Sequence, residues 1–428
     1  MTRQFQALRG TRDVLAAELK RWSVVEHAAK RLARCYGYHD IRTPLIEEAG
    51  LFLRSVGETS DIVQKEMFRF EDRGGHDIVL RPEGTASVVR AYLEQNLDKT
   101  EGFAKLFYVG PMFRAERPQA GRFRQFHQYG VEAIGSASPW VDVEVIVLAC
   151  HILRECGVAD FVVWLSSMGC RKDQERSAAL LRERLAPHRA KLCKECQARF
   201  EKNIFRVLDC KNPACHDLVW KPITGSPFLL CEDCQKHFDA VRQGLRDAGI
   251  PFDDTKVFAR GLDYYTRTVF EVRAQGLGAQ DAVAAGGRYD HLVEELGGPS
   301  LGAVGWAAGI ERVLLTMESA APSAETVPPR HGIYLAVAQP TLIAQGFRYV
   351  QQLRARGVTA LMDYDGKSLK AQLREADKAR CRFVAVLGPK ELEQQTIAIK
   401  DLEQGKETPA RLEAFVDEVA NMLKPSCH

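Results

Sequence analysis

Between residues 105 and 135, the chain spaces an arginine, two carboxylates and an amide as a pocket for a charged small molecule would require. The segment reads KLFYVGPMFRAERPQAGRFRQFHQYGVEAIG and includes Arg114, Glu116, Gln128 and Glu132. An arginine is suited to a phosphate, whereas an amide and a carboxylate are suited to a polar, cationic ligand. We therefore expect a small-molecule pocket here. An exposed hairpin with a solvated, charged tip is the alternative that the spacing alone leaves open.

Two antiparallel strands joined by a basic loop are needed to position these groups. Pro118 and Gly121 are typical turn residues and mark the loop. On the returning strand Gln128, Gly130 and Glu132 share one face, because side chains alternate along a strand. Gly130 has no side chain, so we expect open space above the sheet between the two polar groups. The loop itself carries Arg117, Arg122 and Arg124.

Another carboxylate precedes a predicted helix. The sequences EMFRFED and DIVLRPE flank Gly74-Gly75 and predict a hairpin, and ASVVRAYLEQNL then predicts a helix. Thr85 lies at the helix start, where a threonine is usually only a cap. Glu83 lies just ahead of it, where the helix dipole favours a negative charge. A substrate ammonium group would suit Glu83, and plain capping is the alternative.

Two later stretches combine glycines with arginines or tyrosines. The sequence RGLDYYTRTVFE places Arg260 before a turn, and Tyr264 and Tyr265 on opposite faces at the start of a β-branched strand. A buried tyrosine usually needs only one partner for its hydroxyl, so plain packing is the alternative for either tyrosine. The sequence SLGAVGWAAGIERVLLTM carries Arg312 at the start of an amphipathic run. Its small residues would let the backbone approach a nucleotide, and Arg312 would meet a phosphate.

Five stretches, which follow one another in the order expected for the family, resemble histidyl-tRNA synthetases, a family of class II aminoacyl-tRNA synthetases. The strand–proline–helix passage at residues 38–55 resembles motif 1 of class II, and FRAERPQAGRFRQFHQYGVEAIG resembles motif 2. Residues 300–317 resemble motif 3. RPEGT is similar to the amino-acid-binding stretch of the family, and RGLDYYTRTVFE is similar to its histidine-specific signature. The resemblance extends over nearly the whole chain.

The resemblance implies an α/β (α+β) fold, in which an antiparallel class II sheet is flanked by helices. We expect the catalytic core at residues 1–169 and 251–320, and a helical, cysteine-rich insertion at residues 170–250. Residues 318–330 are rich in Pro, Ala and Ser and predict a linker. Strands and helices alternate beyond it, so residues 331–428 predict an anticodon-binding α/β domain. Motif 1 builds the dimer interface in this family, which implies a homodimer.

The resemblance also implies a histidine–tRNA ligase. Such an enzyme activates L-histidine with ATP and Mg²⁺ to histidyl-adenylate, and transfers histidine to the 3′ end of tRNA(His). The first step needs positioning and charge neutralisation. The implied catalytic residues at the α-phosphate are Arg114 and Arg260, which also belong to the histidine site. The implied ATP residues are Arg114, Glu116 and Arg312. The implied histidine residues are Glu83, Thr85 and Gln128 for the ammonium, and Glu132, Tyr264 and Tyr265 for the imidazole. Arg117, Arg122 and Arg124 would meet tRNA.

Half of the twelve cysteines cluster in the expected insertion. They fall as Cys193-x2-Cys196, Cys210-x4-Cys215 and Cys231-x2-Cys234. Two CxxC pairs can present four thiolates to one tetrahedral ion, so we expect a structural Zn²⁺ at Cys193, Cys196, Cys231 and Cys234. The middle pair leaves two cysteines too many for one site. A set of buried thiols without metal is the alternative.

Composition sets the remaining bounds. The chain has 428 residues and a net charge of +3, which permits nucleic-acid binding without arguing for it. No apolar run is long enough to cross a bilayer, and the N-terminus has no apolar signal core, so we expect a cytoplasmic protein. Two other functions remain open. One is the histidine-binding regulatory paralogue of the ATP phosphoribosyltransferase complex. The other is an RNA-binding or zinc-stabilised interaction protein.

Overall fold

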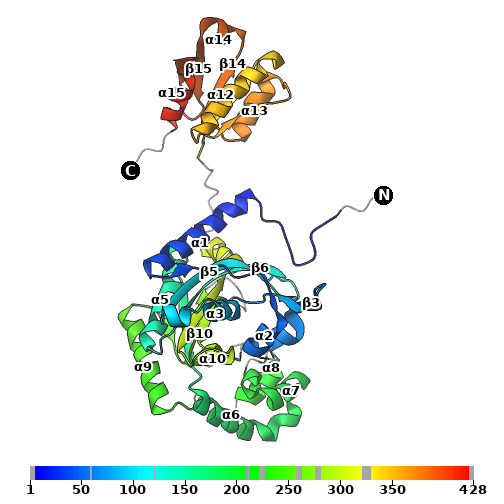
Figure 1. Cartoon of the computed structure of the whole chain (residues 1–428), viewed down its shortest axis with the longest axis vertical. Helices are drawn as coiled ribbons and strands as arrows, with labels where there is room; N and C mark the ends of the chain where they lie inside the picture. Colours follow the sequence, from blue (N-terminus) through cyan, green and yellow to red (C-terminus); the bar gives the residue numbers. More distant parts are fainter. Residues whose placement is uncertain are drawn as a thin grey trace. The chain divides into compact units, whose positions relative to one another are not determined.

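The computed structural model divides into two compact units, residues 1–322 and 323–428 (Figure 1). The structure describes residues 5–57, 60–119, 121–208, 210, 212–220, 227–256, 258, 263–274, 281–320 and 329–423. None of the described helices is both long and apolar enough to span a membrane.

The first unit is built on a largely antiparallel, eight-stranded sheet in the order β1-β5-β6-β11-β10-β9-β7-β8. Only the short edge pairs β1–β5 and β7–β8 are parallel. The predicted hairpin is confirmed, because β5 and β6 pair along their whole length. The strands are β1 His39–Asp40, β5 Ala104–Phe113, β6 Gln125–Ile134, β7 Phe161–Ser167, β8 Phe252–Asp253, β9 Thr266–Ala274, β10 Ala282–Arg288 and β11 Ala303–Gly309.

Alternation along β6 separates an apolar face of the sheet from a polar one. Tyr129 and Val131 point into the core that is shared with α1 (Ala16–Cys35) and α5 (Pro139–Glu155). Gln128 and Glu132 therefore point to the opposite face. Trp22 and Val25 of α1 are buried at helical spacing, which fixes this helix on the apolar face. The helix α11 (Ile310–Ala320) follows β11 and contacts α1.

The chain also forms a separate, small three-stranded sheet, with its strands in the order β2-β4-β3. Val79 of its central strand is fully buried and packs with Phe52 of the helix that follows β2. The segment then leads through α3, whose N-terminus borders the large sheet. The elements are β2 Ile46–Glu48, α2 Ala49–Val56, a π-helical turn Ile62–Glu66, β3 Phe68–Glu71, β4 Asp77–Leu80, α3 Thr85–Glu94, α4 Leu97–Thr100 and, after β10, α10 Leu292–Glu295.

The segment between β7 and β8 is helical, as its sequence predicts (Figure 1). Its last helix packs against α5 and so returns the chain to the large sheet. Its other helices pack together in a core cluster that also includes Tyr264 and Tyr289. The elements of the segment are α6 Arg171–Leu185, the 3-10 turn η2 Ala186–Lys191, α7 Lys194–Lys202, the 3-10 turn η3 Ile204–Val207, α8 Pro213–Trp220 and α9 Glu232–Asp247.

The second unit is a five-stranded mixed sheet in the order β13-β12-β14-β15-β16 with helices packed on it. The expected linker, residues 318–330, overlaps the end of α11 at residues 318–320, and its residues 321–328 lie outside the described part of the chain. The elements are β12 Ile333–Val337, a 3-10 turn Pro340–Leu342, α12 Ile343–Ala355, β13 Ala360–Leu361, α13 Leu369–Lys378, β14 Phe383–Leu387, α14 Pro389–Gln394, β15 Thr396–Asp401, β16 Glu407–Arg411 and α15 Phe415–Met422.

Candidate active site

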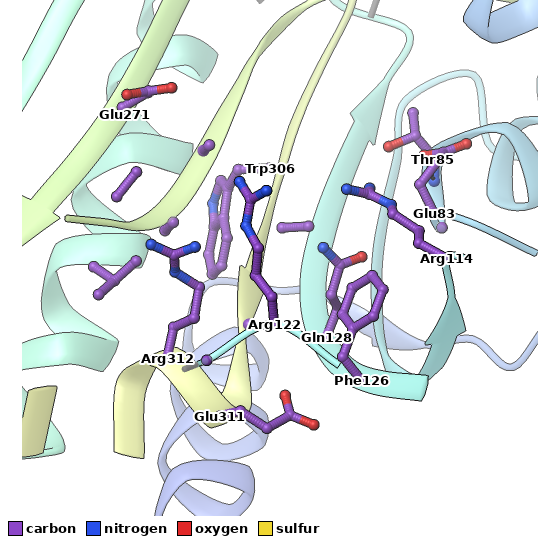
Figure 2. Close-up of a pocket in the computed structure, with 18 of the residues that line it drawn as sticks. Glu83, Thr85, Arg114, Arg122, Phe126, Gln128, Glu271, Trp306, Glu311 and Arg312 are labelled. Atoms are coloured by element: carbon purple, nitrogen blue, oxygen red, sulfur yellow. Dashed lines mark hydrogen bonds between the residues drawn. The ribbon is translucent and has the colours of Figure 1, made fainter. Parts of the chain in front are cut away.

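The polar face of the large sheet forms the floor of a cavity of about 400 Å³ (Figure 2). Strands β6, β9, β10 and β11 supply the floor, while the start of α3 and the β5–β6 loop supply the walls. The cavity has two chemically distinct ends. A carboxylate, an amide and two tyrosines line one end, and arginines line the other. The predicted residues that line it are Glu83, Thr85, Arg114, Glu116, Arg122, Gln128, Tyr264, Tyr265 and Arg312.

Glu83 is a buried helix cap at the polar end. Its two carboxylate oxygens accept hydrogen bonds from the backbone N–H groups of Thr85 and Ala86, at 2.6 and 2.9 Å. Burial nevertheless raises the pKa of Glu83, and these hydrogen bonds oppose the rise. A cationic ligand group would compensate the charge that burial disfavours. Glu83 can therefore cap the helix and also pair with a ligand ammonium group, so the two sequence interpretations do not exclude each other.

Glu132 lies behind the cavity wall. Its oxygens accept hydrogen bonds from the hydroxyls of Thr85, at 2.7 Å, and Tyr289, at 2.5 Å. The side chain has no solvent exposure, and burial raises its pKa to about 8. The hydrogen bonds from Tyr289 and Thr85 work against that rise, and the nearby carboxylate of Glu83 adds to it. Glu132 thus fixes two hydroxyl groups and does not line the cavity itself.

The prediction of open space above Gly130 is wrong, because the Tyr108 side chain fills that space. A Cβ at Gly130 would lie 2.6 Å from the Tyr108 hydroxyl and 2.5 Å from the backbone oxygen of Trp306. Tyr108 belongs to β5 and points to the same face of the sheet as Gly130, its cross-strand neighbour. The missing side chain therefore makes room for an aromatic ring of the protein, and the ligand cavity lies beside it.

Gln128, Tyr264 and Tyr265 complete the polar end. The Gln128 carbonyl oxygen Oε1 is buried and has no hydrogen-bond partner among the described residues, so it is free to accept from a ligand. The two tyrosines were expected on opposite faces of a strand, and this is wrong. Strand β9 begins only at Thr266, and the two rings lie together in the cavity wall with centroids 4.8 Å apart. Burial raises the pKa of Tyr264 well above its usual value.

The other end of the cavity is organised by a carboxylate between two arginines. Arg122 donates to Glu116 at 2.8 Å, and Arg114 lies 3.9 Å from the other oxygen of Glu116. Arg114 also donates to the backbone oxygen of Pro82 and lies over the ring of Phe126. Figure 2 shows Arg122 between Arg312 and Arg114. Arg114 and Glu116 lie in the loop that follows β5, which ends at Phe113.

Arg312 lies close enough to Arg122 for their charges to interact. Burial lowers the pKa of Arg312, and the positive charge of Arg122 lowers it further. The two positive charges repel each other in a partly buried cavity, so an anion with several negative charges would bind favourably between them. The sequence assigned Arg122 to tRNA with the other loop arginines. The positive φ of Gly121, 70°, belongs to the turn that brings Arg122 into the cavity.

Three further cavity residues were missed by the sequence interpretation. Arg273 pairs with Glu271 of the same strand, β9, at 2.9 Å and with Asp281, which immediately precedes β10, at 3.0 Å. All three side chains line the cavity, and the charges of Glu271 and Asp281 act on Arg312. Glu271 and Arg273 are two residues apart on one strand and so share a face. That alternation is the signal that could have found them, and TRTVFEVRA contains it.

The remaining predicted residues lie elsewhere. Arg117 and Arg124 line a separate shallow hollow with Arg9, outside the cavity. The backbone N–H of Arg124 donates to the carbonyl of Gly10, which holds the N-terminal segment against the loop. Arg260 lies outside the described residues.

The expected grouping of Cys193, Cys196, Cys231 and Cys234 in one metal site is wrong. Cys193 precedes α7, whereas Cys231 precedes α9, which packs against α5. The two CxxC pairs are thus carried by different parts of the insertion. Each finds other partners, with ligand atoms within 4.8 Å of one another. The groups are Cys193, Cys196, Cys210 and Cys215, and Cys170, Asp173, Cys231 and Cys234.

Two family models together match most of the chain. The histidyl-tRNA synthetase family model matches residues 10–199 and 231–313, and the anticodon binding domain model matches residues 333–422. The histidine–tRNA ligase of Desulforamulus reducens is 43% identical over 95% of this chain and 97% of its own length. That of Moorella thermoacetica is 44% identical over 96% of each chain.

A solved structure extends the match to three dimensions. The apo Staphylococcus aureus histidyl-tRNA synthetase superposes with a TM-score of 0.80 at 32% sequence identity, over 97% of this chain and 100% of that chain. The predicted α+β fold, a class II sheet with a C-terminal anticodon-binding domain, is thereby confirmed. The chain therefore belongs to the histidyl-tRNA synthetase family of class II aminoacyl-tRNA synthetases.

Proposed function

We propose that the cavity binds L-histidine at its polar end and ATP at its arginine end, and joins them as histidyl-adenylate. The chain is a histidine–tRNA ligase, so adenylate formation is its first chemical step. The observation that carries the proposal is the division of one cavity into a buried polar end and a cationic end. A carboxylate that attacks an α-phosphate needs both substrates held in line and the developing charge neutralised.

Histidine recognition follows from the groups at the polar end. Glu83, Thr85 and Gln128 would receive the α-ammonium, because they supply oxygen acceptors beside the cavity. Tyr264 and Tyr265 would contact the imidazole, which needs a partner for each nitrogen. Glu132 would act behind them, by holding the Thr85 hydroxyl in place. We keep Glu132 as a histidine-site residue in this positioning role.

ATP would lie along the arginines. Arg114, with Arg260 of the family signature, would neutralise the α-phosphate, while Arg312 and Arg122 would hold the outer phosphates. Glu116 would reach the adenine side and orient Arg122. Glu271 and Asp281 offer carboxylate oxygens, which Mg²⁺ prefers, so they would hold the Mg²⁺ of the nucleotide. The ion would supply further neutralisation of phosphate charge.

The tRNA contacts lie outside this cavity. Arg117 and Arg124, together with Arg9, form a basic hollow that would bind phosphates of tRNA(His). The second unit would bind the anticodon, in accordance with its family match. We assign residues 1–169 and 251–320 to the catalytic core, 170–250 to the insertion, 318–330 to the linker and 331–428 to the anticodon-binding domain. Because tRNA is charged for translation, we expect the enzyme to act in the cytoplasm.

The small sheet would form a homodimer interface. Ile46 and Phe70 pair with residues two positions apart on β4, so they share one face of this sheet. They are 50% and 45% exposed, and Leu45 beside them is 41% exposed. The opposite face buries Val79. An apolar face that is left open on a small sheet is suited to a second copy of the chain.

Histidine-dependent exchange between ATP and labelled pyrophosphate, without tRNA, tests the proposed reaction. Exchange with histidine and with none of the other amino acids would support both the cavity and its specificity. Exchange with a different amino acid would contradict the roles of Tyr264 and Tyr265. Histidine binding without any exchange would instead support the regulatory paralogue.

A further inference from the structure

Four cysteine thiols of the insertion converge on one point. The Sγ atoms of Cys193, Cys196, Cys210 and Cys215 all lie within 4.8 Å of one another. The distance between the Sγ atoms of Cys193 and Cys210 is 3.9 Å. A tetrahedral zinc ion with Zn–S bonds of about 2.3 Å separates its sulfur ligands by about 3.8 Å. The four thiols therefore have the spacing of a tetrathiolate zinc site.

Local structure presents each of these thiols. Cys193 is the N-cap of α7, and its sulfur accepts a hydrogen bond of 3.4 Å from the backbone N–H of Cys196. Cys210 follows η3, and Cys215 lies in the first turn of α8. Cys196, Cys210 and Cys215 are buried, and all four are free thiols. The family model leaves out residues 200–230, so the match does not cover the second half of this cluster.

Two residues between Cys196 and Cys210 contact Asp263, which immediately precedes the tyrosine wall of the cavity. Asn203 donates to Oδ1 of Asp263 at 2.8 Å, and Nε and Nη2 of Arg206 donate to the same oxygen at 3.1 and 3.0 Å. Arg206 is only 6% exposed, whereas the side chain of Asp263 is 26% exposed, so the pair is shielded from water on the arginine side. Asp263 immediately precedes Tyr264, which lines the cavity.

We propose that Cys193, Cys196, Cys210 and Cys215 bind one structural Zn²⁺, which holds Asn203 and Arg206 against Asp263 and thereby orders the tyrosine wall of the cavity. The ion would crosslink α7, the end of η3 and α8, which are all short elements. Arg206 is a positioning residue in this arrangement, because it acts on the cavity through Asp263. The part of the proposal that concerns the tyrosine wall relies on the assignment of the cavity to histidine.

Metal content measures the zinc site independently of activity. The full-length protein is purified without a metal-affinity tag, dialysed against buffered Zn²⁺ and then against metal-free buffer, and analysed by elemental mass spectrometry. Cys215→Ser should contain one equivalent of zinc less per chain than the wild type. Cys381→Ser, a buried thiol of the second unit, should keep the wild-type value. Equal zinc in Cys215→Ser and wild type would overturn the site, as would a wild type that takes up no zinc.

Cobalt substitution and kinetics complete the test. Co²⁺ in the wild-type protein should give thiolate charge-transfer and tetrahedral d–d bands that Cys215→Ser lacks, and spectra without them would overturn the ligand set. Arg206→Gln should keep its zinc and raise the KM for histidine in pyrophosphate exchange about three- to tenfold, with kcat and the KM for ATP nearly unchanged. An unchanged KM for histidine in Arg206→Gln would overturn the link between the zinc site and the tyrosine wall. The zinc content of Cys215→Ser would still show whether the four cysteines bind zinc.

Discussion

The Tyr289 hydroxyl donates a 2.5 Å hydrogen bond to Glu132, and it does so from the residue that follows β10 to the C-terminal part of β6. The same carboxylate accepts from Thr85 at the start of α3. One buried group therefore connects two strands of the large sheet with α3, the helix that Glu83 caps. This connection fixes the polar end of the cavity from behind, and a change in the charge of Glu132 should be felt in both stability and histidine binding.

Stability should depend on pH through Glu132. Its pKa in the folded protein is about 8, compared with an ordinary value of 4.5. The folded state keeps a proton that the unfolded chain loses, so the contribution to stability is fully present below about pH 4.5 and is lost as the pH rises to about 8. Glu132→Gln has no proton to lose. Between about pH 5 and about pH 9, the wild type should lose at least about 1.4 kcal/mol more unfolding free energy than the variant.

Urea unfolding followed by tryptophan fluorescence measures this difference. All five tryptophans belong to the first unit, so the signal reports on the unit that contains Glu132. Other titrating groups are the same in both proteins and cancel in the comparison. Parallel pH profiles for wild type and Glu132→Gln would show that Glu132 is ionised throughout, and would contradict its raised pKa.

Two glycines on one strand should respond differently to an added methyl group. A Cβ at Gly305 would lie 1.8 Å from Oε2 of Glu132 and 2.5 Å from the backbone oxygen of Val131. A Cβ at Gly309 would meet only Arg312, at 3.5 Å, which is an ordinary contact. Gly305→Ala should therefore lower the unfolding free energy by about 1–3 kcal/mol and raise the KM for histidine. Gly309→Ala is the matched control and should change stability by less than about 1 kcal/mol. Equal stabilities of the two variants would contradict the packing around Glu132.

Arg122 should act on ATP, and Arg117 on tRNA. Arg122→Ala removes a cavity cation beside Arg312, so it should raise the KM for ATP in tRNA-free pyrophosphate exchange by about tenfold or more. Arg117→Ala changes the outer hollow and should leave this exchange unchanged. It should instead raise the KM for tRNA(His) in aminoacylation, more strongly at low salt. If Arg122→Ala altered only the tRNA step, the sequence-based assignment of Arg122 to tRNA would be right.

The homodimer should depend on the exposed face of the small sheet. Ile46→Glu places a charge in this apolar face, and it should convert a dimer into a monomer with the mass of one chain, 47.9 kDa. Light scattering during size-exclusion chromatography measures the mass. Phe347→Glu changes a comparably exposed side chain of the second unit, 42% exposed, and should remain dimeric. A dimeric Ile46→Glu would show that the interface lies elsewhere. A monomeric wild type would show that the chain does not form the proposed dimer.

The sequence could predict the family, the fold and the enzyme, because these depend on short stretches whose order is preserved along the chain. Those three predictions are confirmed. The hairpin of β5 and β6 and the helix before Cys35 follow from alternation and helical spacing within one segment. Each of these features is decided by residues that are close in sequence.

The errors concern residues whose neighbours come from distant segments. Tyr108 fills the space above Gly130 because β5 pairs with β6 in one particular register. Arg122 enters the cavity because the loop turns at Gly121, whereas Arg117 and Arg124 remain with Arg9. The cysteine pairs were grouped by their similar spacing, but their partners depend on how four helices fold over one another. Such arrangements are tertiary and leave no local signal.

Aminoacylation of tRNA(His) by the wild-type protein, with labelled histidine, ATP and Mg²⁺, tests the proposed function at its final product. Histidine should become attached to the 3′ end of this tRNA, with pyrophosphate released, and no other amino acid should be attached. Histidine bound by the protein without transfer to tRNA would contradict the proposed function, as would the attachment of a different amino acid.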